Sequence, residues 1–152
     1  MFSISEVDKS DSDLLWLESE LDAFQSALYP AESNHCLDLS TVTDEQLRCI
    51  IVRDGGGLHA GCGALLFHEN GSAEIKRVYI RPEYRGRKLG EQIVSVIETI
   101  ASEKNSSLLE LETGIHQQPA IALYRRCGYE ICNAFPPYTT DPLSVYMCKK
   151  LP

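Results

Sequence analysis

The sequence predicts an α/β fold in which helices pack against a mixed sheet, and three observations predict it. Short segments with the alternating or wholly apolar patterns of strands recur along the chain. Between them lie segments whose apolar residues repeat at the three- and four-residue spacing of helices. The 152 residues suffice for one full hydrophobic core, and no repeat or Pro/Gly/Ser-rich linker divides them. We therefore expect one domain over residues 1–152 with the element order β-α-β-β-β-α-β-α-β-β.

The first half of the chain predicts one long helix and four strands. Leucines recur at helical spacing along residues 11–28, Ser and Asp residues precede them, and Pro30 follows. The stretch Asp54-Gly55-Gly56-Gly57 separates two apolar runs and has the composition of a hairpin turn. The expected elements are a strand over 2–7, a helix over 11–28, a polar loop over 29–43, and strands over 49–53, 58–68 and 74–80.

The second half predicts two helices and three strands. Leu89, Ile93 and Ile97 lie on one face of the longer helix. Pro119 suits the first turn of the shorter helix, and Gly128 suits its C-terminal cap. The expected elements are a helix over 89–104, a strand over 108–113, a helix over 120–127, and strands over 129–132 and 143–149.

Composition and charge exclude several classes of protein. The formal net charge of −8 argues against nucleic-acid binding, which requires a basic surface, and slightly favours cationic substrates such as amines. No apolar run approaches the roughly 20 residues that span a membrane, and residues 1–8 lack the features of a secretory signal, so we expect a cytoplasmic protein. The six cysteines include no C-x-x-C pair, which predicts buried free thiols and no metal site.

One short segment concentrates positive charge in this acidic chain. Six of the 14 Lys and Arg residues fall between positions 76 and 88, where an apolar strand ends and a Gly-containing turn opens a helix. A helix N-terminus already carries about half a positive charge, so three further cations at 85, 87 and 88 are unfavourable unless an anion binds there. Phosphate is the usual anion at such a position. The sequence therefore predicts a diphosphate-binding turn, with a solvated basic turn as the alternative.

Two segments carry a family resemblance. Arg85-Gly86-Arg87-Lys88-Leu89-Gly90 resembles the acetyl-CoA-binding signature [QR]-x-x-G-x-[GA] of the GNAT superfamily of N-acetyltransferases, and residues 120–129 resemble its second signature, A-x-x-L-Y-x-x-x-G-[FY]. The resemblance implies a mixed, mostly antiparallel central sheet flanked by helices on both faces. It also implies acetyl-CoA as co-substrate and no metal. Lys88 departs from the family, which usually has Gly there; a side chain is tolerated if residue 88 already lies in the first helical turn.

The resemblance also implies which residues bind the coenzyme. The backbone of the basic turn would hold the pyrophosphate, and the end of the preceding strand would align the pantetheine arm and supply an N–H group to the oxyanion. The expected coenzyme-binding residues are Val78, Tyr79, Ile80, Arg85, Gly86, Arg87, Lys88, Leu89 and Gly90.

Two proton-transfer roles follow from the same resemblance. Tyr124 would protonate the departing thiolate, since a phenol stays protonated at neutral pH; an aromatic residue of the core is the alternative. Glu74 occupies the position of an acidic residue often seen on this strand, and it is the expected base that deprotonates the amine. Glu110 and Glu112, which share one face of their strand, water-mediated deprotonation and His116 stay open as alternatives.

Polar clusters in two irregular segments are candidates for acceptor specificity. By composition alone they could equally be turns and caps. The resemblance places the acceptor pocket in these regions, after the first helix and between the last strands. The expected substrate-binding residues are Glu32, Asn34, His35, Glu112 and Tyr138.

The sequence therefore predicts an acetyl-CoA-dependent N-acetyltransferase that modifies a primary amine of a small molecule by direct attack in a ternary complex. A non-catalytic acyl-CoA-binding regulatory module on the same fold and a protein or peptide N-acetyltransferase are the alternatives. The apolar strand over 143–147 is a candidate edge for a homodimer. The identity of the amine stays open, because a fold does not fix a substrate.

Overall fold

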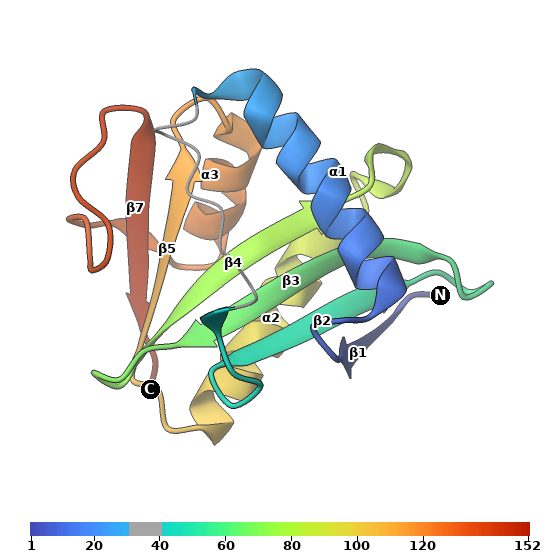
Figure 1. Ribbon diagram of the computed structural model, residues 1–152, viewed down its shortest axis with the longest axis horizontal. Helices are drawn as coiled ribbons and strands as arrows, with labels where there is room; N and C mark the ends of the chain where they lie inside the picture. Colours follow the sequence, from blue (N-terminus) through green and yellow to red (C-terminus); the bar gives the residue numbers. More distant parts are fainter. Residues whose placement is uncertain (31–40) are drawn as a thin grey trace.

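The computed structural model describes residues 1–30 and 41–152, and in these the chain forms a seven-stranded sheet with helices on both faces (Figure 1). The predicted fold class and element order are confirmed, with a short 3₁₀ helix added before the second long helix. The elements are β1 (Ser3–Val7), α1 (Ser12–Leu28), β2 (Leu47–Arg53), β3 (His59–Phe67), β4 (Ser72–Ile80), the 3₁₀ helix η3 (Pro82–Tyr84), α2 (Leu89–Glu103), β5 (Leu108–Gly114), α3 (Gln118–Arg126), β6 (Glu130–Ile131) and β7 (Ser144–Lys150).

The sheet is antiparallel except at one pair of strands. Its order is β1-β2-β3-β4-β5-β7-β6, and only β4 and β5 run parallel within the described residues. A parallel pair needs a long crossover, which α2 supplies on one face of the sheet (Figure 1).

Two apolar cores lie on opposite faces of the sheet. On one face α1 buries Leu14 and Leu17 against β2 and β3, because residues three apart share a side of a helix. On the other face α2 buries Ile93 and Ile97 against the central strands. Alternation along each strand supplies both cores: in β2, Ile50 faces α2 and Ile51 faces α1.

The described cysteines are free thiols, as predicted. Cys49 and Cys62 belong to the core beneath α1, and burial raises the pKa of the Cys49 thiol to about 12. Among residues 1–30 and 41–152, no group of three or more His, Cys, Asp or Glu side chains is placed to hold a metal ion. Within the same residues, no helix combines the length and apolarity that crossing a membrane requires.

Strands β4 and β5 diverge beyond the middle of β4 (Figure 1). Their pairing covers only Ser72–Ile75 with Leu108–Leu111. A bulge follows in β4, where Arg77 has φ 58° and the register with β3 shifts between Cys62 and Ala64. Bulges bend a strand and end regular pairing. The second half of β4 therefore presents to β5 a backbone edge that β5 does not pair.

Candidate active site

A cavity of about 620 Å³ lies between the diverging end of β4 and the segment that follows β5. Leu21 and Phe24 of α1 border it on one face of the sheet. The turn before α2 and the helix α3 border it on the other face. The cavity therefore reaches both faces of the sheet through the gap that the bulge in β4 opens.

The end of β4 forms one wall of this cavity. Val78, Tyr79 and Ile80, which were predicted to align the pantetheine arm, all line it. Because β5 leaves this part of β4 unpaired, its backbone groups on that edge can bind a ligand instead.

The predicted diphosphate-binding turn forms another wall. Arg85, Gly86, Lys88, Leu89 and Gly90 line the cavity. Gly86 has φ +80°, a conformation that favours glycine. The first N–H groups of α2 have no acceptor within the helix, which makes its N-terminus a site for an anion.

Lys88 does not lie in the first helical turn. It precedes α2 as the N-cap residue, with φ 60° and ψ 26° in the left-handed region. A side chain is disfavoured in that conformation, and the usual glycine would adopt it freely. The condition under which a side chain at position 88 would be tolerated is therefore not met, because the helix begins one residue later, at Leu89.

The arginines of the turn point in different directions. Arg85 lines the cavity, donates from Nε to the Ile80 carbonyl at 3.0 Å, and lies over the Tyr79 ring. Arg87 does not line the cavity: its guanidinium lies 5.8 Å from the centre of the Phe2 ring and 5.9 Å from that of Tyr84. Arg85, rather than Arg87, is thus placed to meet a ligand in the cavity.

Arg126 and Tyr84 are among the cavity-lining residues that the sequence analysis did not predict. Arg126 ends α3 and forms an ion pair with Glu91 at 3.7 Å. Its spacing of three from Leu123, another wall residue, was the signal that could have found it. Tyr84 ends η3, directly before the turn, where no periodic pattern marks it.

Tyr124 lies in the cavity wall on α3 and is 7% exposed. No group of the described residues forms a hydrogen bond with its hydroxyl, while its ring packs edge-on against Tyr129 with centroids 5.9 Å apart. Burial raises the pKa of this phenol well above its ordinary value. The hydroxyl is therefore protonated and available to a ligand.

Glu74, the expected base, does not lie in the wall of the cavity. It is 1% exposed and does not line the cavity. His68 Nε2 lies 3.1 Å from its Oε1, and Lys76 Nζ lies 3.0 Å from its Oε2, which also accepts a hydrogen bond from the Tyr138 hydroxyl. Burial alone would raise the pKa of Glu74, but these hydrogen bonds and the Lys76 charge outweigh burial and hold it below its usual value. A carboxylate with these partners is a structural ion-pair member and a weak base.

The predicted acceptor-binding residues divide into three groups. Tyr138 joins Glu74 and also accepts a hydrogen bond from Lys76 Nζ at 2.6 Å. Glu112 accepts a hydrogen bond from Ser144 Oγ at 2.7 Å, and neither Tyr138 nor Glu112 lines the cavity. Glu32, Asn34 and His35 lie outside the described residues. The structure thus brings Tyr138 to Glu74, but not to the cavity.

The position of His116 depends on Tyr29, the C-cap residue that follows α1. The Tyr29 ring stacks on His116 with centroids 5.8 Å apart, and its hydroxyl accepts the His116 N–H at 3.1 Å. This packing requires glycine at position 114, because a Cβ there would lie 1.8 Å from the Tyr29 hydroxyl. Tyr29 therefore fixes the segment after β5 that places His116 in the cavity wall.

Comparison with known proteins finds likeness over most of the chain. The model of the acetyltransferase (GNAT) family matches residues 12–129. The IAA acetyltransferase of Azospirillum brasilense is 43% identical over 136 residues, which are 89% of this chain and 88% of that protein. A Klebsiella pneumoniae protein, described as an acyl-CoA N-acyltransferase, has a crystal structure that matches with a TM-score of 0.90 and 41% identity, over 99% of this chain and 98% of that one. The PaiA N-acetyltransferase of Thermoplasma acidophilum, crystallised with coenzyme A, shares the fold at a TM-score of 0.75 and 17% identity, over 99% of each chain.

Proposed function

Because the chain belongs to the GNAT family of acetyltransferases, we propose that it transfers the acetyl group of acetyl-CoA to a primary amine of a small molecule, by direct attack in a ternary complex. One observation carries the proposal. One cavity is lined both by the basic turn before α2, proposed to bind the diphosphate, and by Tyr124, whose hydroxyl has no hydrogen-bond partner among the described residues.

The residues of the cavity fit a coenzyme A ester. The N–H groups at the start of α2 and the side chains of Arg85 and Lys88 would bind the diphosphate. The unpaired edge of β4 would align the pantetheine arm. When bound, acetyl-CoA supplies an acetyl group activated as a thioester, and its own chemistry needs no metal.

The proposed reaction has two proton transfers. The amine nitrogen forms a bond to the acetyl carbon, the carbon–sulfur bond breaks, and the sulfur receives the proton of the Tyr124 hydroxyl. A backbone N–H of Val78 or Tyr79 would donate to the carbonyl oxygen as it gains negative charge, and one such donor is typically worth about 10²–10³ in rate. The raised pKa of Tyr124 keeps its hydroxyl protonated at neutral pH, and the tyrosinate that the transfer leaves would regain a proton from solvent.

The second proton leaves the amine, and His116 or a water molecule beside it would accept it. His116 lines the cavity and is exposed to solvent. Histidine is the side chain that takes up and releases protons near neutral pH. Glu74 lacks access to the cavity, so it would act instead by holding Lys76 and Tyr138 in place.

The acceptor would be a small amine, and the acidic net charge of −8 favours cationic ones through long-range attraction. Tyr138 and Glu112, which do not line the cavity, stay proposed determinants of acceptor choice, as do Glu32, Asn34 and His35. IAA, the compound in the name of the Azospirillum brasilense relative, is also an acceptor to test.

An acceptor screen tests the proposal. Purified protein is mixed with acetyl-CoA and with polyamines, amino acids, aminoglycosides, arylamines, IAA or peptides, and release of free CoA thiol is measured, with the product identified by mass. Turnover of a small amine that is lost in Tyr124→Phe, without loss of CoA binding, is the expected result. Turnover of peptides alone would identify a protein N-acetyltransferase. CoA binding without any turnover would identify a regulatory module.

A further inference from the structure

We propose that Asp54 and Tyr84 form a brace that holds the phosphate-binding turn, residues 85–88, in the shape that receives the coenzyme. Asp54 lies outside the cavity, in the hairpin between β2 and β3, so it would be a positioning residue. The inference rests on the proposed coenzyme site and adds a partner to it from a distant segment of the chain.

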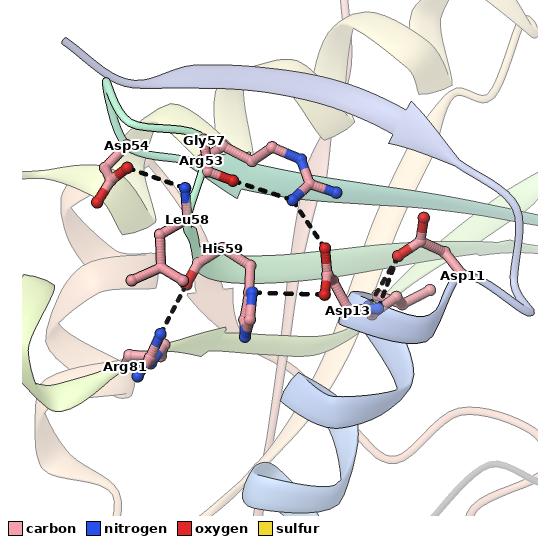
Figure 2. A network of polar contacts seen from close by, with 9 residues as sticks. Asp11, Asp13, Arg53, Asp54, Gly57, Leu58, His59 and Arg81 are labelled. Atoms are coloured by element: carbon pink, nitrogen blue, oxygen red, sulfur yellow. Dashed lines mark hydrogen bonds and ion pairs between the residues drawn. The ribbon is translucent and has the colours of Figure 1, made fainter.

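The hairpin fixes the Asp54 carboxylate in place. Its Oδ1 accepts hydrogen bonds from the N–H groups of Gly56 and Leu58, each at 2.9 Å, and the second of these is drawn in Figure 2. The Asp54 N–H in turn donates to the Leu58 carbonyl at 2.9 Å. The second carboxylate oxygen, Oδ2, accepts a hydrogen bond from the Tyr84 hydroxyl at 2.7 Å.

Tyr84 carries this restraint to the turn. It is the last residue of η3 and immediately precedes the turn. Its ring contacts Phe2 edge-on, with centroids 5.9 Å apart, and the guanidinium of Arg87 lies 5.9 Å from its centre. Tyr84 is therefore linked to the turn covalently, as the residue that precedes it, and by its ring contact with Arg87. It is linked to the hairpin by the hydrogen bond of its hydroxyl.

Arg81 makes a second attachment between the same two segments. Its N–H donates to the Ala60 carbonyl at 2.9 Å, and its guanidinium donates to the His59 carbonyl at 3.1 Å (Figure 2). Both ends of η3 are thus attached to the β2–β3 hairpin: Arg81 before it and Tyr84 at its end.

The turn needs such a restraint, because Lys88 has φ 60°, a left-handed backbone conformation that a residue with a Cβ disfavours. Such a conformation persists only where the surroundings hold it. Gly86, at φ +80°, adopts its conformation without strain but also adopts others readily. If Tyr84 is released, the turn samples other shapes, and a ligand must reorder it on binding. We expect about tenfold weaker binding of any ligand that contacts the turn.

The test compares four single variants, the double variant Asp54→Ala/Tyr84→Phe and two ligands. Asp54→Ala and Tyr84→Phe each remove the bond, and Tyr84→Phe keeps the ring. Asp54→Asn keeps one oxygen acceptor, for the N–H groups of Gly56 and Leu58, and replaces Oδ2 by an amide N–H that can donate to the Tyr84 hydroxyl oxygen. Asp13→Ala is the matched control, since Asp13 binds Arg53 and His59 in the neighbouring network of Figure 2 without touching the turn. Calorimetry measures the Kd for CoA and for pantetheine, which lacks the diphosphate, and hydrogen exchange follows the amides of 85–90 in the free protein.

The brace predicts that Asp54→Ala and Tyr84→Phe raise the Kd for CoA about tenfold, leave that for pantetheine unchanged and speed amide exchange at 85–90. The double variant Asp54→Ala/Tyr84→Phe should be no worse than either single one. Asp54→Asn should lie between Asp54→Ala and the wild type, because it replaces a hydrogen bond to a carboxylate by a weaker neutral one. Asp13→Ala should resemble the wild type. Unchanged CoA affinity and exchange in Asp54→Ala, or equal weakening of pantetheine, would overturn the proposal. If the wild type binds no CoA, the coenzyme site fails, and exchange at 85–90 still decides whether the brace restrains the turn.

Discussion

Replacing Lys88 by glycine is expected to stabilise the folded protein, although it removes a side chain. Lys88 is the N-cap of α2 at φ 60° and ψ 26°. A left-handed conformation costs a residue with a Cβ about 1–2 kcal/mol, and glycine avoids this cost. Glycine loses about 0.5–1 kcal/mol more backbone entropy on folding. The difference leaves a gain of about 0.5–1 kcal/mol in the free energy of unfolding.

Urea and thermal unfolding measure this gain. For a protein of this size, 1 kcal/mol corresponds to about 2–4 °C in Tm, so Lys88→Gly should melt roughly 1–4 °C above the wild type. Two controls separate conformation from charge. Lys88→Ala removes the same ammonium and keeps the strain. Lys104→Gly changes the C-cap of the same helix, where φ is −96°, so it should lower stability by about 0.5–1 kcal/mol.

The reasoning is refuted if Lys88→Gly is no more stable than Lys88→Ala, or if Lys104→Gly gains as much. Binding of CoA gives a second comparison. Both variants at 88 lose the same positive charge from the cavity wall. They should therefore weaken CoA binding alike, by a few-fold.

Three further predictions follow from the site and its supports. Tyr124→Phe should lower kcat about 10²-fold or more with unchanged CoA affinity, and the raised pKa of Tyr124 means that wild-type kcat should show no alkaline loss from this group up to about pH 10. Glu74→Gln should lower the free energy of unfolding by about 1–3 kcal/mol near pH 7, because Lys76 loses its buried partner. Since the pKa of Glu74 is lowered in the folded state, its stabilisation is complete above the unfolded value near 4.3 and lost as pH falls through the folded one, so urea titrations near pH 3 should show a smaller difference. Gly114→Ala should cost about 3 kcal/mol or more, because its Cβ would overlap Tyr29, and Tyr29→Ala in the same chain should recover part of that loss; no loss of Tm in Gly114→Ala would contradict this packing.

The element order was predictable because the signals for it are local. The apolar residues of α1 and α2 recur at three- and four-residue spacings, and the structure buries Leu14, Leu17 and Leu21 of α1 and Ile93 and Ile97 of α2. Leu15, Phe24 and Leu28 of the α1 pattern are exposed instead. The bounds were less predictable, since pairing partners decide them. Strand β2 begins at Leu47 rather than at Cys49 because Leu47 pairs with Leu66 of β3.

The cavity wall that we propose to bind the coenzyme was predictable for the same reason. Residues 78–80 and most of 85–90 form one continuous strand–turn–helix, so a sequence pattern can place them together. The direction of Arg87 and the conformation of Lys88 were not predictable. Arg87 packs on Phe2, which comes from the other end of the chain, and the start of α2 depends on tertiary contacts.

Of the two residues predicted to transfer protons, the sequence could place Tyr124 in the cavity but could not show the surroundings of Glu74. Tyr124 lies in a motif and lines the cavity. The position of Glu74 depends on His68 and on Tyr138, which is 64 residues away. The spacing of residues in the sequence cannot show that the Glu74 carboxylate already binds three side chains. The expectation that Glu74 is the base therefore depended only on its strand and its residue type.

Calorimetric titration with acetyl-CoA and with CoA is the most direct test of the central claim, that the cavity at the turn before α2 binds the coenzyme diphosphate. The structure predicts saturable binding of both at one site per chain. Arg85→Ala should weaken binding more than Arg87→Ala, because Arg85 lines the cavity and Arg87 lies over Phe2 and Tyr84. No saturable binding of either ligand, or a larger loss in Arg87→Ala than in Arg85→Ala, would contradict it.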